Sequence, residues 1–349
     1  RLVQASTGDS IRSWRYADGW LASQSVTDAQ GTSTVEFVRD EDGRIVEIGA
    51  DGVATTYAYD EAAQLIEAGA TRWVYDGCGR LVTESTGEHV VSHTHDLAGQ
   101  LVTSTGPDGT TRYSYDAVGR RVGQTRPDGS GRAFEWGPTG WLSGVSERST
   151  QGERFTPIRV DAEGQLCAIG DSAVVWDVAL PIPALPRVGE ASVLAAGALT
   201  GVDGRWLSAG WRDGRSTSAA NPWLPAEALR VAAGVDLTPS AGLLIGGLEW
   251  LDARVYDAST HGFLSVDPLP PTVGAGWAGN PYAYAGNNPL GLLDPTGLHP
   301  VTDADLAAYA AAHGGALAAA SDWVSNNWEY LAGGAMVIGR NTADPARWK

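Results

Sequence analysis

The sequence predicts a mainly β fold, built as a long antiparallel sheet of tandem hairpins. The first observation behind this prediction is a repeated core of the form aromatic-x-aromatic-Asp-x-x-Gly-Arg-Leu. The second is its spacing, because the clear copies place their aspartates at positions 40, 60, 76, 96 and 116. Weaker copies begin at Phe134, Ile158 and Val174. Self-similarity at a period of this size is the signature of a repeat architecture.

Each unit has the chemistry of a β-hairpin. In Tyr113-Ser114-Tyr115 the two aromatic residues are two positions apart, so both project from one face of a strand. Asp116 and Gly119 are residue types that a type I turn favours at its first and last positions. Pro107-Asp108-Gly109 and Pro127-Asp128-Gly129 are turn signals at the other end of the strands. Consecutive hairpins of this kind extend one antiparallel sheet.

The hairpin array is expected to occupy residues 1–178. One hairpin cannot bury its own apolar face, so neighbouring hairpins must supply a shared core. From residue 179 the repeat fades, and Pro181, Pro183 and Pro186 interrupt the strand pattern because proline cannot donate to a ladder. We expect residues 179–250 to form an irregular continuation of the sheet or a plug.

The composition argues against several classes of function. The 349 residues carry 41 acidic against 24 basic side chains, and the net charge of −17 argues against binding to nucleic acid or an anionic membrane. The longest apolar runs are too short to span a bilayer. Cys78 and Cys167 make no disulfide framework and have no metal-ligand spacing. His93 and His95 occupy the two aromatic positions of a repeat, which favours a packed pair over a metal site. No cofactor is predicted.

The strand pattern restarts at residue 251, and residues 251–298 hold the candidate site. Two Asp-Pro steps, Asp267-Pro268 and Asp294-Pro295, flank an aromatic Tyr-Ala-Tyr and an Asn-Asn-Pro turn. Either step alone is typical of a turn. The pair is followed by Gly297-Leu298, where the composition changes, and this context favours two carboxylates that converge on a peptide bond.

The repeats from about residue 35 to 177 resemble the YD repeats of the Rhs and YD-repeat family, and residues 252–298 resemble the Rhs-associated core domain. The second resemblance rests on A-R-V-Y-D-A-S-T-H-G-F-L-S-V-D-P, N-P-Y-A-Y-A-G-N-N-P-L and D-P-T-G-L. It implies a spiralling hollow shell whose core domain cuts the chain after its final leucine. Carried over, the carboxylates are Asp267 and Asp294, and the scissile bond joins Leu298 to His299. Pro270 departs from the family, which usually has glycine at that place.

Two close carboxylates can hydrolyse a peptide bond without a metal. They do not both ionise, so one activates water while the other hydrogen-bonds the scissile carbonyl. The sequence does not assign the two parts, because such a pair titrates as a unit. Arg254 is a candidate to orient a carboxylate by a bidentate contact, and a structural ion pair is the competing interpretation. Cleavage of this kind is a single turnover within one chain.

Residues 299–349 are expected to be helical. Thr302 to Asp305 offers an N-cap with an acidic first turn, and a second helix is expected over residues 316–331. The resemblance implies that this tail is the truncated start of a toxic effector, carried as cargo. It also implies an exported protein, with an immunity protein and a secretion machinery as partners. Since the chain begins with Arg1 and shows no signal sequence, we expect upstream sequence, or another chain, to complete the shell.

Two other functions fit parts of the sequence. A secreted or cell-wall-associated adhesion protein without catalysis would use the repeat aromatics to bind carbohydrate, and the chain has 14 Trp and 11 Tyr. Coplanar Trp side chains exposed on the outer face would favour that function, whereas burial toward a lumen favours the shell. A chain that is itself a catalytic toxin is disfavoured, because residues 299–349 contain no plausible catalytic set.

Overall fold

The structure is a computed structural model of the chain. It describes residues 3–7, 10–50, 52–162, 164–177, 184–196, 199–203, 205–208, 223, 228–237, 242–270, 274–292, 294, 296–298 and 300. The helices expected between residues 302 and 331 lie outside the described residues.

The predicted mainly β fold is confirmed. Twenty-two strands form one sheet, here called the wall, in which each strand pairs antiparallel with the next one along the chain. The wall strands are β1 (Gln4–Thr7), β2 (Ser10–Ala17), β3 (Trp20–Asp28), β4 (Gly31–Arg39), β5 (Ile45–Ala50), β6 (Val53–Tyr59), β7 (Leu65–Ala68), β8 (Thr71–Tyr75), β9 (Leu81–Thr86), β10 (His89–His95), β11 (Leu101–Gly106), β12 (Gly109–Tyr115), β13 (Arg121–Thr125), β14 (Gly131–Trp136), β15 (Leu142–Ser149), β16 (Gly152–Val160), β17 (Leu166–Ile169), β18 (Ser172–Asp177), β19 (Ala184–Val188), β20 (Ala191–Ala196), β21 (Leu199–Val202) and β22 (Arg205–Ser208).

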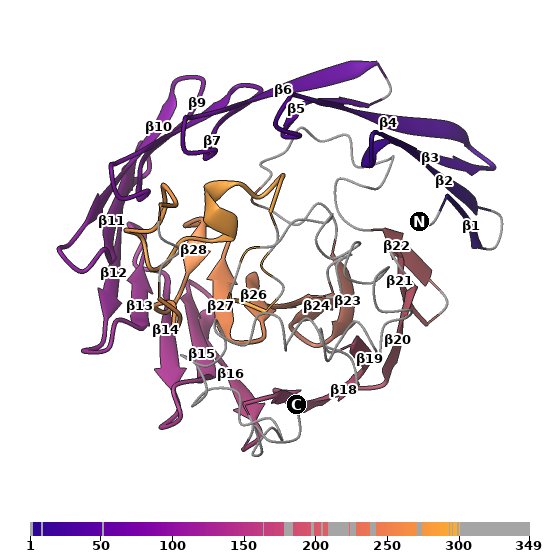
Figure 1. Cartoon of the computed structure of the whole chain (residues 1–349). Coiled ribbons are helices and arrows are strands. Elements are labelled where there is room, and N and C mark those ends of the chain that lie inside the picture. The colour runs from indigo at the N-terminus through magenta and orange to yellow at the C-terminus, as the bar shows by residue number, and fades with distance from the viewer. Residues whose placement is uncertain are drawn as a thin grey trace, which may run out of the picture.

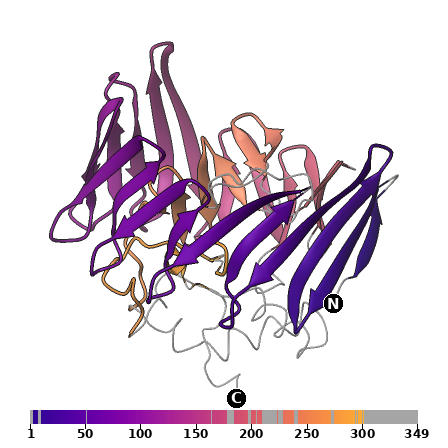
Figure 2. The same ribbon diagram turned by 90° about the horizontal axis from the view of Figure 1, so that it is seen from above.

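A second sheet of six strands, here called the inner sheet, lies within the curve of the wall (Figure 1). Its strands pair antiparallel in chain order. They are β23 (Leu229–Ala232), β24 (Val235–Leu237), β25 (Leu243–Ile245), β26 (Leu248–Leu251), β27 (Arg254–Asp257) and β28 (Gly262–Phe263), followed by the short 3-10 helix η2 (Ala285–Asn287). The wall bends around this sheet, and its two ends, β1 and β22, come round toward each other. Figure 2 shows the wall hairpins standing side by side along the curve.

One apolar core joins the two sheets. Its buried members include Val145 and Ile158 from the wall and Val235, Leu243 and Leu248 from the inner sheet. All five side chains are at most 3% exposed. Burying the concave face of the wall requires the inner sheet, because a hairpin array alone leaves one apolar face open.

Residues 179–250, expected as an irregular continuation or a plug, contain both kinds of strand. β19 to β22 extend the wall across residues 184–208. β23 to β26 belong to the inner sheet. The expected boundary between residues 250 and 251 falls within β26, so the inner sheet spans both expected segments.

The turn of each repeat explains its Asp-x-x-Gly-Arg sequence. Asp116 Oδ1 accepts the N–H groups of Val118 and Arg120 at 3.1 and 2.9 Å, and Arg120 Nε donates to Asp116 Oδ2 at 2.7 Å. Gly119 adopts a φ of +83°, which L side chains rarely reach. A Cβ there would also run into Val266 and the Tyr282 hydroxyl.

The residue five positions after the repeat aspartate (after Gly137 in one unit) is here called the leucine position, and it holds each unit to the core. It is apolar and at most 8% exposed in six of the units that the sequence aligns: Ile45, Leu65, Leu81, Leu101, Leu142 and Leu166. The second aromatic of a unit donates to the carbonyl of a preceding leucine position, as in Tyr59 to Ile45 at 2.8 Å and Trp136 to Arg121 at 2.8 Å. Arg121 is the exception, because it places a charged side chain at the leucine position and is still only 2% exposed.

Candidate active site

Three residues that the sequence singles out lie together at the start of β27. Arg254 is the first residue of β27 and is 3% exposed. Its Nη2 contacts Asp267 Oδ2 at 2.8 Å and Asp294 Oδ2 at 3.2 Å. Because one nitrogen contacts both oxygens, the two carboxylates converge on the same cation.

The Arg254 side chain is held from several directions. Its guanidinium packs over the Phe263 ring, 3.7 Å from the ring centroid. Nε donates to the Gly297 carbonyl, and Nη1 donates to the Pro281 carbonyl at 3.5 Å. Burial lowers the pKa of Arg254, while Asp294 and Asp267 oppose that shift, so the carboxylates keep the buried cation paired.

Asp267 is positioned by backbone contacts on both sides of its Pro268. Its N–H donates to the Pro281 carbonyl at 2.9 Å, and its Oδ1 accepts the Leu269 N–H at 2.9 Å. Pro270 is exposed and does not keep Asp267 from Arg254. Burial raises the pKa of Asp267, and the Arg254 charge partly opposes the rise.

Asp294 begins a tight turn that ends at Leu298. Its Oδ1 accepts the Leu298 N–H at 2.9 Å, and its carbonyl accepts the Gly297 N–H at 3.2 Å. The turn is fastened to the start of β27 by the Ala253 N–H, which donates to the Thr296 carbonyl at 3.0 Å. Gly297 has a φ of +64°, and a Cβ there would collide with the Leu251 carbonyl oxygen. Leu298 is 7% exposed, and His299 lies outside the described residues.

Both aspartates therefore organise turns, which is the structural role expected of an Asp-Pro step. A turn does not require the second carboxylate oxygen of each residue to meet a buried arginine, however. Asp294 is 1% exposed as a side chain, and Asp267 is 21% exposed. Burying two carboxylates beside one another is costly without such a partner. The arrangement brings two carboxyl groups to one guanidinium, and one of them, Asp294, also accepts the Leu298 N–H.

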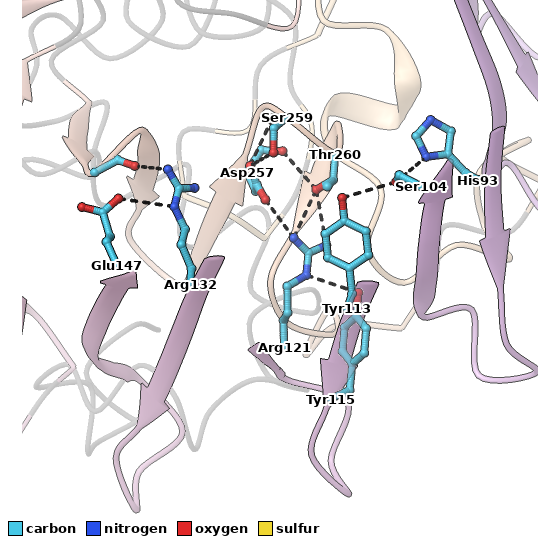
Figure 3. Close-up of polar contacts among 11 residues, drawn as sticks. His93, Ser104, Tyr113, Tyr115, Arg121, Arg132, Glu147, Asp257, Ser259 and Thr260 are labelled. Carbon is cyan, nitrogen blue, oxygen red and sulfur yellow. Dashed lines mark hydrogen bonds and ion pairs between the residues drawn. The ribbon is translucent and has the colours of Figure 1, made fainter. Parts of the chain in front are cut away.

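The site is tied to the wall by residues that the sequence reasoning missed. Arg121 Nη1 contacts Asp257 Oδ2 at 2.8 Å, and both side chains are at most 2% exposed. Figure 3 shows this pair with Thr260, Tyr113 and Tyr115 around the guanidinium. The arginine at the leucine position of this repeat is the sequence feature that could have predicted the ion pair.

Two further bonds connect the wall turns to the site segments. The Tyr282 hydroxyl donates to the Gly119 carbonyl at 2.8 Å, and Tyr282 follows the Pro281 carbonyl that holds Asp267 and Arg254. Asn287 Nδ2 donates to the Gly79 carbonyl at 2.7 Å. These two repeat turns therefore help to hold the segments that carry the site in place.

The histidine pair of the fourth repeat is packed rather than clustered with ligands. His93 is 8% exposed, its Nδ1 lies 2.8 Å from Ser104 Oγ, and burial lowers its pKa to about 4. Among the described residues no group of three or more His, Cys, Asp or Glu side chains is placed to hold a metal ion. Cys78 and Cys167 are both free thiols. In the same part of the chain, no helix has the length and apolar character needed to cross a membrane.

One family model matches part of the repeat array, and the chain is similar to solved structures. The family model described as RHS Repeat matches residues 95–131, which contain the unit centred on Asp116. No curated protein matches the sequence. A solved structure of the Photorhabdus luminescens Tc holotoxin pore, with a TccC3 variant, is similar at 16% identity and a TM-score of 0.48, over 84% of this chain and 18% of that one. A crystal structure of TcdB2-TccC3-Cdc42 is similar at 15% identity and a TM-score of 0.48, over 85% of this chain and 19% of that one.

The chain spans about a fifth of the length of these solved chains. Tandem units with an Asp-x-x-Gly turn, an aromatic pair and a buried leucine position define a β-hairpin repeat protein. The RHS Repeat match lies among those units, so residues 95–131 are similar to an RHS repeat.

Proposed function

We propose that this chain is part of a Rhs-type toxin shell that encloses a C-terminal effector and releases it by one cut in its own backbone, after Leu298. The observation that carries the proposal is the convergence of Asp267 and Asp294 on the buried Arg254, with Asp294 bonded to the Leu298 N–H. Paired carboxylates beside one defined peptide bond are the equipment of an aspartyl cleavage.

The burial of the aromatic residues supports a shell over an adhesion protein. Trp14 and Trp73 of the wall and Trp250 of the inner sheet are at most 5% exposed. No Trp or Tyr is among the exposed large hydrophobic residues in the described part of the chain. A carbohydrate platform needs exposed aromatic faces, so the alternative lacks its binding surface there.

The proposed reaction is hydrolysis by an activated water. The ionised carboxylate takes a proton from water as the water oxygen attacks the Leu298 carbonyl carbon. The protonated carboxyl hydrogen-bonds the carbonyl oxygen, where negative charge develops. The bond to the His299 nitrogen then breaks as that nitrogen accepts a proton. The products are a carboxylate on Leu298 and a free amine on His299.

The surroundings of the two carboxyls favour one assignment. Burial raises the pKa of Asp267, so Asp267 is the better carrier of the shared proton. Both carboxyls contact Arg254 and accept one backbone N–H, so the raised pKa of Asp267 is what separates them. We assign Asp294 as the base and Asp267 as the acid.

The partners follow from the same proposal. The cargo begins at His299, and upstream sequence or another chain completes the shell. Export, a secretion machinery and an immunity protein belong to the toxin function and rest on the resemblance of residues 252–298 to the Rhs-associated core domain.

Expressing the chain and measuring intact mass under denaturing conditions tests the cut. Two fragments that meet at Leu298–His299 are expected from the wild type. Asp267→Asn should leave the chain whole, because asparagine keeps the acceptor for Leu269 but cannot supply the carboxyl proton. A whole wild-type chain, or a cut at another bond, contradicts the proposed function.

Cleavage should also slow on the alkaline side of its pH profile. Asp267 acts in its protonated form, and burial raises its folded pKa above the ordinary value. The acid is therefore present below the folded pKa and is lost as the pH rises through it. Single-turnover rates from about pH 4 to pH 8 would measure this, and a rate that keeps rising with pH contradicts the assignment.

A further inference from the structure

Arg121 departs from the pattern of its own repeat. The other aligned units have Ile or Leu at this position, and these side chains fill the core. A buried ion pair is seldom more stable than apolar residues of similar size, because desolvation costs as much as the attraction returns. With the Asp257 charge also removed, the chain would be at least as stable with leucine here, so stability does not explain the ion pair.

The partner of Arg121 is an aspartate that lacks a basic partner in its own turn. In the repeats, Asp116 pairs with Arg120 four residues later. Four residues after Asp257 stands His261, whose Nε2 lies 3.4 Å from Glu84 instead. Asp257 receives Arg121 from the wall at 2.8 Å, together with the hydroxyl of Ser259 at 2.6 Å.

Two features connect the Arg121–Asp257 pair to the candidate site. Asp257 is the last residue of β27, the four-residue strand that begins with Arg254. The Arg121 backbone N–H donates to the Leu264 carbonyl at 2.8 Å, and the Leu264 N–H donates to the Val255 carbonyl at 2.9 Å. Leu264 lies three residues before Asp267. One wall residue thus fixes the strand of Arg254 and the segment that leads to Asp267.

We propose that Arg121 is a positioning residue for self-cleavage, which sets the Arg254–Asp267–Asp294 geometry from the wall through Asp257. The inference rests on the proposed function. It also predicts that the site needs the wall, since Arg254 is the only arginine or lysine in residues 251–298. Misplacement by about 1 Å commonly costs on the order of a hundredfold in rate.

The decisive variant is Arg121→Leu combined with Asp257→Asn in the full chain. It restores the leucine of the other repeats and removes the charge that would be left unpaired, so the chain should unfold at a denaturant concentration equal to or above that of the wild type. The single-turnover rate of the Leu298–His299 cut should fall about tenfold to a hundredfold. Arg121→Lys, which keeps the charge on a more flexible stem, should recover part of the rate. Arg44→Leu is the matched control, because it breaks the equivalent 2.8 Å pair with Asp40 in another repeat turn and should leave the rate within about twofold.

The outcomes separate two failures. A wild type that stays whole overturns the proposed function, and the positioning role with it. A wild type that is cut, with the double variant cut equally fast, overturns the positioning role alone. A rate loss that follows the loss of folded protein, or is equal in Arg44→Leu, also overturns it, because a merely structural role predicts that result.

Discussion

Asp294→Asn should leave the chain uncut at Leu298–His299. The substitution preserves the shape of the side chain and an oxygen that can accept the Leu298 N–H, now held at 2.9 Å. It removes the negative charge and the proton acceptor that the proposed mechanism assigns to Asp294. General base catalysis contributes about a hundredfold to ten-thousandfold in rate, so a chain that cleaves during expression should be recovered whole. Intact mass under denaturing conditions is the measurement.

Asp40→Asn is the matched control for that experiment. Asp40 also binds an arginine through a carboxylate oxygen, with Arg44 Nε at 2.8 Å, but it lies in a wall turn near the start of the chain. Its loss should leave cleavage unchanged. If Asp294→Asn is cut as fast as the control, the carboxylate pair is only a turn and ion-pair device, and the proposed base is wrong.

The repeats made most of the fold predictable. An aromatic pair two residues apart and an Asp-x-x-Gly turn are local signals, and each hairpin pairs with its neighbour in sequence. Tyr113 to Gly119 therefore predicted a strand and a turn without knowledge of distant residues. The inner sheet was not predicted, because β23 to β26 lack the repeat and their partners are set by burial against the wall. Burial of this kind depends on contacts far apart in sequence.

Like the fold, the candidate site was predicted only where its residues form local sequence motifs. Asp267 and Asp294 were found because the Asp-Pro steps are visible as motifs, and Arg254 because it heads the same segment. Their anchor on the wall was not found, since Arg121 lies 136 residues before Asp257 and no local pattern joins them. The only sequence signal for this pair is that Arg121 stands where the other aligned repeats have an apolar residue.

The same exception suggests how a repeat shell acquires a specific function. Most wall units are interchangeable, because their turns and leucine positions repeat the same contacts. The unit from Tyr113 to Arg121 differs, because its leucine position supplies a buried cation to Asp257 of the inner sheet. Under the proposed role of Arg121, a change at one leucine position is enough to connect the wall to the site.

Arg254→Met should destabilise the folded chain strongly at neutral pH, and two added substitutions should reverse the loss. The variant leaves the carboxylates of Asp267 and Asp294 together without their cation. Removing one partner from a buried charge cluster typically costs about 3–5 kcal/mol in the free energy of unfolding. The variant is also expected to remain uncut, so the cut does not complicate its unfolding curve. Urea denaturation at neutral pH would measure the loss.

Adding Asp267→Asn and Asp294→Asn to Arg254→Met removes the unpaired charges, and this triple variant should regain most of the lost free energy. Lowering the pH should reduce the difference in free energy of unfolding between Arg254→Met and the triple variant. Without Arg254, the remaining carboxyls bind protons more tightly in the folded than in the unfolded chain, so the destabilisation grows as the pH rises and fades as it falls. If the triple variant is no more stable than Arg254→Met at neutral pH, the arginine acts by packing on Phe263 and not by its charge. The charge-based account then fails, and with it the reason for placing an ionised carboxylate at Leu298.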